Sequence, residues 1–563
     1  MADPKAEPVR RLPDPQVGTD GKLAGKSSLT PQAMKTRGAI AVPPRKVIPV
    51  IMVPGIMGSN LRAKRTPANE SEQNKELNPG RPAWSPPNGT LAGLNEASTW
   101  ENRNPAQRQR ILDGDTVEVD DSGFIELDDD DFAETDEAAL RKRWWGELHW
   151  DSYGELLVDL HINLNKTFTL SMFRNRIPNS HWEDVIEYDK KDWDASDMPA
   201  LTEPELEKFA KFHYPVYACG YNWIQSNERS AERLKLRIEE IIKFWTDRKY
   251  ECKQVILVTH SMGGLVARAC AKQIPNLIVG IVHGVMPALG APLAYRRVTC
   301  GTEATAPGKG RLDSIAMGKF ADIAGRTTER TTPAMATACG ALELLPNHLY
   351  PKPWLVAAVK KPDGTLQNLS ALQPDNPYDL YRDLKIWYRL INPDLADPAE
   401  KYKNTTGGVA VAIEKAVSQA EHFHMEFLNT YYHPNTYAYY GADEDEMSFG
   451  IFRWVTDNQN ALGKDVGPLI PLGRTAAGLW PGGGRAIRFP AHTVAKNEGL
   501  LFGPGVQDAP GDGTVSQQSG AGPRGQIKRI FRTTGYDHQG SYKDAAMLKL
   551  THHLIVKIAQ VAK

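Results

Sequence analysis

The stretch VILVTHSMGGLVAR, residues 255–268, joins an apolar β-branched run, a short polar turn and a helix-forming segment. An apolar run without polar alternation is typical of a strand that is buried on both faces. Ser261 stands at the junction, where a strand-to-helix elbow presents a serine hydroxyl and needs small residues two positions to either side. Gly263 meets that need downstream, whereas Thr259 replaces the usual upstream glycine. The stretch predicts a nucleophile elbow with Ser261 as the nucleophile, and the alternative is a buried serine at a helix N-terminus.

Strands and helices alternate on both sides of this elbow. Apolar β-branched runs predict strands, and apolar residues at steps of three or four predict helices. The predicted strands are residues 46–53, 215–218, 254–258, 278–285, 436–440 and 527–533, and the predicted helices are residues 147–164, 226–248, 263–273, 409–431 and 542–561. This alternation predicts the α/β class with a mostly parallel central sheet and helices on both faces, and together with the elbow at Ser261 it predicts the α/β-hydrolase fold with large insertions.

The whole chain is divided into four parts at the places where the periodicity of strands and helices fades. These parts are a flexible N-terminal arm, two parts of a hydrolase core and a cap or lid between them. In chain order these are residues 1–44 (arm), 45–295 (core, with a polar insertion at about 62–140), 296–405 (cap or lid) and 406–563 (core, with an excursion at about 442–510). The four aspartates at 128–131 are interpreted as solvated surface, with a calcium loop as the alternative.

Composition excludes several classes of protein. Lys plus Arg number 67 against 68 for Asp plus Glu, which leaves no broad positive field for nucleic acid. No run approaches the roughly 20 apolar residues of a membrane span, and the first 40 residues lack a signal-peptide pattern. The five cysteines show no metal-binding spacing. We expect synthesis in the cytoplasm, with no nucleic-acid partner, no transmembrane segment, no cofactor and no metal.

A serine nucleophile in this fold needs a base and an acid that follow it in the chain. His538 alone among the 14 histidines lies between the last predicted strand and the last predicted helix, so it is the predicted base. The histidines that fit less well are His260 (beside the serine but across the turn), His552 and His553 (inside the final helix), and His422 and His424 (expected on a helix surface).

The predicted acid is Asp512, in the turn GDGTV at residues 511–515. Its flanking glycines allow a tight turn, and the 26 residues that separate it from His538 leave room for one strand. Asp443, directly after the strand at 436–440, is the alternative, although its acidic neighbours indicate a hydrated turn. His538 would remove the Ser261 proton, and Asp512 would fix the imidazole tautomer.

Two backbone N–H groups should bind the oxyanion of the tetrahedral intermediate. Met262, directly after the nucleophile, is one predicted donor. Ile56, in the loop PGIMGS after the first strand, is the other, with Met57 as the second choice. The residues predicted to line a cleft for acyl chains are Trp223, Met286 and Leu289. Such apolar side chains also occur simply as core, which is the alternative.

Five motifs together resemble one branch of the α/β hydrolases. They are VPGIMGSNL, CGYNW, LVTHSMGGLVAR, MPALGAP and GDGTV. The chain resembles the lecithin:cholesterol acyltransferase-like branch, and GPI-inositol deacylases and many bacterial lipases and esterases are similar. It also resembles bacterial lipase effectors that are delivered by type VI secretion. The likeness covers the core strands, roughly half of the chain, and leaves both excursions unmatched.

The resemblance implies a lipase or phospholipase A that cleaves carboxylic esters of lipids through Ser261, His538 and Asp512 and an acyl-enzyme intermediate. It also implies export by a specialised secretion system to a target-cell periplasm, with a secretion spike or an immunity protein as partner. An intracellular esterase, a polyester depolymerase or an acyl amidase on the same fold is the alternative. A non-catalytic binding protein on the same scaffold is a further alternative.

Overall fold

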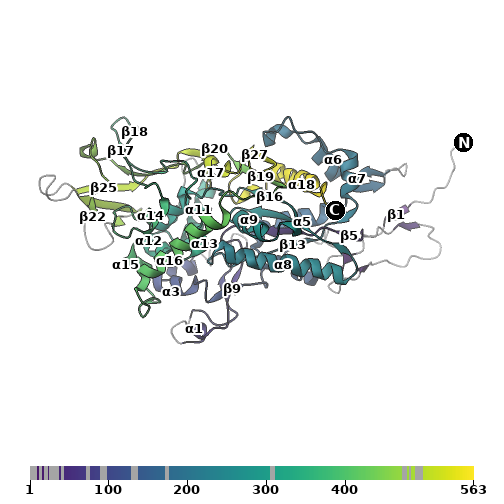
Figure 1. Ribbon diagram of the computed structural model, residues 1–563, viewed down its shortest axis with the longest axis horizontal. Coiled ribbons are helices and arrows are strands. Elements are labelled where there is room, and N and C mark those ends of the chain that lie inside the picture. The colour runs from purple at the N-terminus through teal and green to yellow at the C-terminus, as the bar shows by residue number, and fades with distance from the viewer. Residues whose placement is uncertain are drawn as a thin grey trace.

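A six-stranded parallel sheet forms the centre of the computed structural model (Figure 1). The structure describes residues 44–71, 76–88, 98–127, 137–170, 176–304, 311–471, 479–480, 483–488 and 499–562, and four short strands before them. The strands of the central sheet are, in spatial order, β13 (Val216–Ala218), β6 (Val50–Val53), β15 (Val255–His260), β16 (Ile278–Gly284), β19 (Thr436–Gly441) and β27 (Arg529–Thr533). All five strand pairs are parallel, which confirms the predicted fold class.

Alternate side chains of the central strands enter two different cores. Ile51 and Leu257 pack in the core under α8 (Asn227–Asp247) and α9 (Gly263–Gln273). Met52 and Val258 point the other way, into the core under α5 (Trp150–Asn163), α6 (Ser180–Glu187), α7 (Glu203–Phe209) and α18 (Ala545–Ala559). Both faces of the sheet are therefore covered, which explains the continuous apolar runs of its central strands, such as VIMV in β6 and VILV in β15.

The predicted helix at 409–431 is α16 (Gly408–His422), which continues as a π-helical turn, η5 (Phe423–Leu428). The wider turn changes the direction of the side chains that follow. His424 is consequently buried rather than on the surface: one ring nitrogen lies 2.8 Å from the Tyr378 hydroxyl and the other 2.9 Å from the Glu343 carbonyl oxygen. The expectation of a surface position was wrong for His424, whereas the side chain of His422 is partly exposed, as expected.

The two irregular excursions meet in a second sheet, which the sequence analysis did not predict. Its path is β18-β17-β21-β25-β24-β22, with β23 beside β24, and Figure 1 shows it at the end of the molecule away from α6 and α7. The first excursion supplies β17 (Leu355–Lys360) and β18 (Leu366–Ala371), and the second supplies β21 (Phe452–Thr456), β22 (Ile470–Pro471), β23 (Leu479–Trp480), β24 (Gly484–Arg488) and β25 (Gly499–Pro504).

A third core joins this sheet to the helices of the cap. The indole rings of Trp387 and Trp454 meet edge to face at 5.7 Å between centroids, and Trp387 donates a hydrogen bond to the Val466 carbonyl oxygen at 2.9 Å. The cap helices are α10 (Pro292–Cys300), α11 (Arg311–Ala324), α12 (Thr328–Met335), α13 (Cys339–Leu342), α14 (Pro377–Arg382) and α15 (Pro393–Ala396).

The polar insertion near 62–140 contains a small antiparallel sheet. Its strands are, in spatial order, β8 (Pro82–Trp84), β7 (Leu61–Ala63) and β9 (Val117–Val119), and the helix α3 (Pro105–Ile111) lies between β8 and β9 in the chain. The aspartates at 128–131 lie outside the described residues. In the predicted arm only the strands β1 (Val9–Arg11), β2 (Gln16–Val17), β3 (Leu23–Ala24) and β4 (Arg37–Ala39) are described before residue 44. Of the helices described, none has the length and apolarity to cross a membrane.

Candidate active site

Ser261 occupies a sharp turn between β15 and α9, as the elbow motif predicts. Its backbone φ is 51°, in the left-handed region, and its N–H donates to the Gly284 carbonyl oxygen at 2.9 Å. Gly263 is required here because a Cβ at this position would lie 2.4 Å from the carbonyl oxygens of Val53 and Pro54. Thr259 is tolerated in place of glycine since its hydroxyl finds a partner on the next strand, the Nδ1 atom of His283 at 2.8 Å.

His538 and Asp512 lie in line with the Ser261 hydroxyl. The Nε2 atom of His538 is 2.8 Å from the Ser261 Oγ atom, and its Nδ1 atom is 2.8 Å from the Asp512 Oδ2 atom. The His538 N–H also donates to the Asp512 carbonyl oxygen at 2.7 Å. Only 1% of the Asp512 side chain is exposed, against 13% for His538. These three groups can therefore pass a proton from the hydroxyl to the imidazole, with the carboxylate fixing the tautomer.

The turn after β26 (Ala509–Gly511) fixes the Asp512 carboxylate. Its other oxygen, Oδ1, accepts hydrogen bonds from the N–H groups of Thr514, at 3.0 Å, and Val515, at 2.7 Å. Gly513 has a φ of 83°, which a side chain would strain, so the GDGTV sequence is suited to this turn.

Asp443 has other partners. Its segment is a strand, β20 (Asp443–Ser448), that pairs with β26, so the expectation of a turn was wrong, although Glu444 and Asp445 are exposed as a hydrated segment requires. The Asp443 carboxylate accepts hydrogen bonds at 2.8 Å from the N–H groups of Asp445 and Gly535. Asp443 thus holds the loop after β27, the strand that precedes His538.

A chain of hydrogen bonds behind the elbow was missed in the sequence analysis. The Gly55 N–H donates to the Tyr153 hydroxyl at 2.9 Å, and this hydroxyl lies 2.9 Å from the Nδ1 atom of His260. The Nε2 atom of His260 lies 2.9 Å from the His538 carbonyl oxygen, which only a protonated Nε2 can satisfy. Burial, with a smaller contribution from His538, lowers the pKa of His260 to about 3, so the ring is neutral.

This arrangement connects the loop after β6 to the loop that bears His538. Tyr153 lies in α5 and is distant in the sequence from both loops. The sequence therefore predicted the helix but contained no local signal for this contact. His260 was noted as lying across the turn from the serine, and its position there is what allows it to reach His538. Tyr542 adds a further contact, since its hydroxyl donates to the Thr259 carbonyl oxygen at 3.0 Å.

The predicted oxyanion loop lies against the nucleophile. A Cβ on Gly55 would be 3.0 Å from the Cβ of Ser261, so the backbone that carries the Ile56 N–H is adjacent to the elbow. Met57 has a φ of 63°, and its carbonyl oxygen accepts a hydrogen bond from the Trp84 indole at 2.9 Å. Met262 is buried at the start of α9.

The residues predicted to line an acyl cleft differ in their surroundings. Trp223 is buried in the core, where its ring meets that of Trp84 at 5.3 Å between centroids. Met286 is buried beside Gly264. Leu289 is partly exposed, and its N–H donates to the Ser519 hydroxyl at 3.1 Å. Ser261 itself is only 5% exposed, so this conformation gives a bulky ester little access to it.

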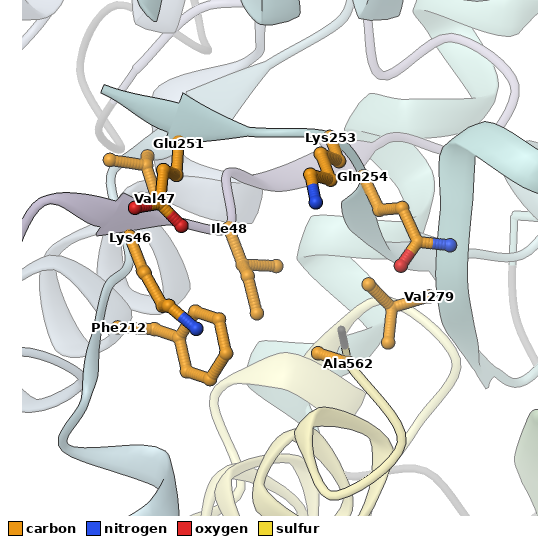
Figure 2. Close-up of a pocket in the computed structure, with 9 residues that line it drawn as sticks. All are labelled: Lys46, Val47, Ile48, Phe212, Glu251, Lys253, Gln254, Val279 and Ala562. Carbon is orange, nitrogen blue, oxygen red and sulfur yellow. The ribbon is translucent and has the colours of Figure 1, made fainter. Parts of the chain in front are cut away.

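A pocket at the opposite edge of the sheet is too small to be a substrate site. It is lined at the start of β5 (Lys46–Val47) by Lys46, and by Phe212, Glu251 and Val279, and Figure 2 shows these side chains around it. Its volume is about 10 Å³, enough for about one water molecule. Ser261 and His538, by contrast, follow the carboxyl ends of β15 and β27, which is the edge where open α/β sheets bind ligands.

Comparison with known proteins gives two matches. Residues 224–306, which include the elbow, match the family model PGAP1, described as a PGAP1-like alpha/beta domain. The whole chain is similar to a solved chain in the crystal structure of the Tle4–Tli4 complex, with 28% sequence identity and a TM-score of 0.72. That similarity covers 92% of this chain and 99% of the other. No curated protein matches the sequence. These findings confirm the α/β-hydrolase fold and the resemblance on which the sequence analysis relied.

Proposed function

We propose that this protein is a serine lipase that hydrolyses carboxylic esters of membrane lipids. The observation that carries the proposal is the continuous line of 2.8 Å contacts from the Asp512 carboxylate through the His538 imidazole to the Ser261 hydroxyl. It is supported by the position of this line at the carboxyl edge of a parallel sheet and by the match to a PGAP1-like alpha/beta domain.

In the proposed reaction the Ser261 Oγ atom attacks the ester carbonyl carbon while His538 Nε2 accepts the hydroxyl proton. The N–H groups of Met262 and Ile56 stabilise the resulting oxyanion. The intermediate then collapses, the alcohol leaves with the proton from His538, and the fatty acid remains esterified to Ser261. A water molecule, deprotonated by His538, attacks this acyl-enzyme in the same way and releases the free fatty acid.

Replacement of Ser261 by alanine tests the proposal. Wild-type protein should release fatty acid from phosphatidylethanolamine vesicles, and Ser261→Ala should reduce the rate to background while the melting temperature shows that the variant is folded. Replacement of the partly exposed His422 by alanine is the control, because it removes an imidazole outside the proposed site. Unchanged hydrolysis by folded Ser261→Ala would overturn the proposal. Parallel assays with triolein, a hydroxyalkanoate polyester and a fatty acyl amide separate a lipase from an esterase, depolymerase or amidase.

We further propose that the lipase is an exported antibacterial effector with an immunity partner. Support comes from the similarity over nearly the whole chain to a protein that was solved in a two-protein complex, Tle4–Tli4. Directed to the periplasm of a bacterial host by an added export signal, wild-type protein should stop growth and Ser261→Ala should not. Equal toxicity of both proteins, or toxicity only without the export signal, would contradict this assignment.

A further inference from the structure

Three helices on one face of the central sheet bring two imidazoles and a carboxylate together. Asp159 comes from α5, His181 from the first turn of α6, and His552 from the middle of α18. The possible ligand atoms of these side chains all lie within 4.8 Å of one another. α5 and α6 each pack against α18 on the side of the molecule where Figure 1 places α6, and none of the three residues belongs to the proposed lipase site.

The cluster contains electron-pair donors that lack a hydrogen-bond partner. His552 Nε2, His181 Nε2 and Asp159 Oδ2 are each buried and make no hydrogen bond. The His552 side chain is completely buried, and the edge of the Trp182 ring covers it at 5.6 Å between ring centroids. Buried polar atoms without partners are uncommon because each costs about 1–3 kcal/mol, so a cluster of three suggests a missing common partner.

The surrounding hydrogen bonds fix the chemistry of two of the three side chains. His552 Nδ1 lies 3.0 Å from the Leu548 carbonyl oxygen, to which only a protonated nitrogen can bond, so the lone pair of the neutral ring is on Nε2. The side-chain amide of Asn163 donates to Asp159 Oδ1 at 2.8 Å, while Asp159 Oδ2 lies 3.4 Å from His552 Nδ1 and makes no hydrogen bond. Metal-binding histidines and carboxylates characteristically have such supporting contacts.

We propose that Asp159, His181 and His552 form a binding site for a divalent transition-metal ion of the zinc class, which ties α5, α6 and α18 together. Two imidazole nitrogens and one carboxylate oxygen suit Zn²⁺ and disfavour Ca²⁺ and Mg²⁺, which require oxygen ligands. Ligand atoms in a tetrahedral zinc site lie about 3.4 Å from one another, so the three side chains would rotate toward a common centre when the ion binds.

The sequence analysis expected no metal because it considered cysteine spacing, whereas these ligands are 22 to 393 residues apart in the chain.

Metal binding to the full chain, purified without a histidine tag, tests the site. Metal-free protein titrated with Zn²⁺ should bind one ion per chain and melt at a higher temperature with zinc than without it. Co²⁺ should bind in its place and give the visible absorption of a four-coordinate ion. A chain that binds no zinc above background and has an unchanged melting temperature would overturn the proposal.

Two conservative variants identify the ligands. Asp159→Asn and His181→Asn should each weaken zinc binding at least about a hundredfold, since even the loss of a supporting contact costs 10- to 100-fold. Both residues are partly exposed, so these variants are expected to fold, whereas His552 is fully buried and is left unchanged. Asp184→Asn is the matched control, because it removes an exposed carboxylate near His181 outside the ligand set. Equal zinc affinity in all three variants would refute the assignment.

Discussion

Ser261 and His538 are held by residues that never touch a substrate in the proposed reaction. The Asp512 carboxylate contacts the His538 ring at 2.8 Å, while Asp443 supports the same loop from a neighbouring strand through the Gly535 N–H. The two aspartates therefore differ in what they contact, and they give a matched pair for mutation.

Asp512→Asn should reduce kcat about 10³- to 10⁴-fold, because an amide in place of the carboxylate favours the wrong imidazole tautomer. Asp443→Asn should retain most activity, since the side-chain carbonyl of asparagine can still accept from the Gly535 N–H. Steady-state hydrolysis of a soluble short-chain ester measures both variants. A larger loss in Asp443→Asn than in Asp512→Asn would assign the acid to Asp443 instead.

We expect Tyr153 to position His538 through His260. Tyr153→Phe leaves both the Gly55 N–H and the His260 Nδ1 atom without a partner, so we expect kcat to fall about 10-fold and its pH profile to shift, with little change in KM. Tyr431→Phe is the control, because the Tyr431 hydroxyl donates to Ala271, near the far end of α9. A pH profile of Tyr153→Phe that matches the wild type would show that the contact is only structural.

These residues also show what a sequence can predict. Ser261, His538 and Asp512 each follow a strand or a glycine turn that is recognisable locally, and the structure brings them together in the predicted order. Tyr153 lies inside an ordinary amphipathic helix, 107 residues before the histidine it contacts, and no local pattern marks it. The distinction is physical: turn geometry is encoded by neighbours in the chain, whereas a contact between a helix and a loop depends on tertiary packing.

At the scale of elements, the predicted strands of the central sheet are present because their apolar runs require burial on both faces. The second sheet escaped prediction because its strands are short and its central pair, β17 and β21, joins residues from the two separate excursions. Strand pairing between distant segments leaves no periodic signal in either segment. The cap was expected as an irregular insertion, and it instead shares a sheet and a core with the later excursion.

The elbow itself should be highly sensitive to added volume. Gly263→Ala should lower the free energy of unfolding by at least about 1–3 kcal/mol, because its Cβ would lie 2.4 Å from two backbone carbonyl oxygens that cannot rotate away. Gly264→Ala should cost less, since the obstructing atoms belong to the flexible Met286 side chain. Urea denaturation of both variants checks the order, and a larger loss in Gly264→Ala would contradict this account of the elbow.

Over the whole molecule, buried neutral histidines should make the fold sensitive to acid. Burial lowers the pKa of His260 and His283 to about 3 and that of His424 to about 4, from an ordinary value of 6.5. Between pH 6.5 and these lowered pKa values, the histidines are protonated in the unfolded chain but not in the folded chain. Their contribution to the free energy of unfolding is therefore complete above pH 6.5 and is lost as the pH falls. Each histidine should lower the free energy of unfolding by up to about 1.4 kcal/mol per pH unit in this range. Urea unfolding at a series of pH values measures the slope, which His283→Gln should reduce; a flat profile would contradict the burial of these rings.

Access to Ser261 is the other property of the whole molecule, because an ester must reach a residue that is 5% exposed beside an imidazole that is 13% exposed. We expect the cap to move when the protein meets a lipid surface, since an apolar interface can stabilise an open form that water disfavours. The rate of hydrolysis of a short-chain ester should therefore rise steeply where the ester begins to form micelles, and a fluorophosphonate should label Ser261 faster when vesicles are present. The same labelling rate with and without vesicles would mean that small molecules already reach Ser261 in the closed conformation, and the cap would then have no gating role.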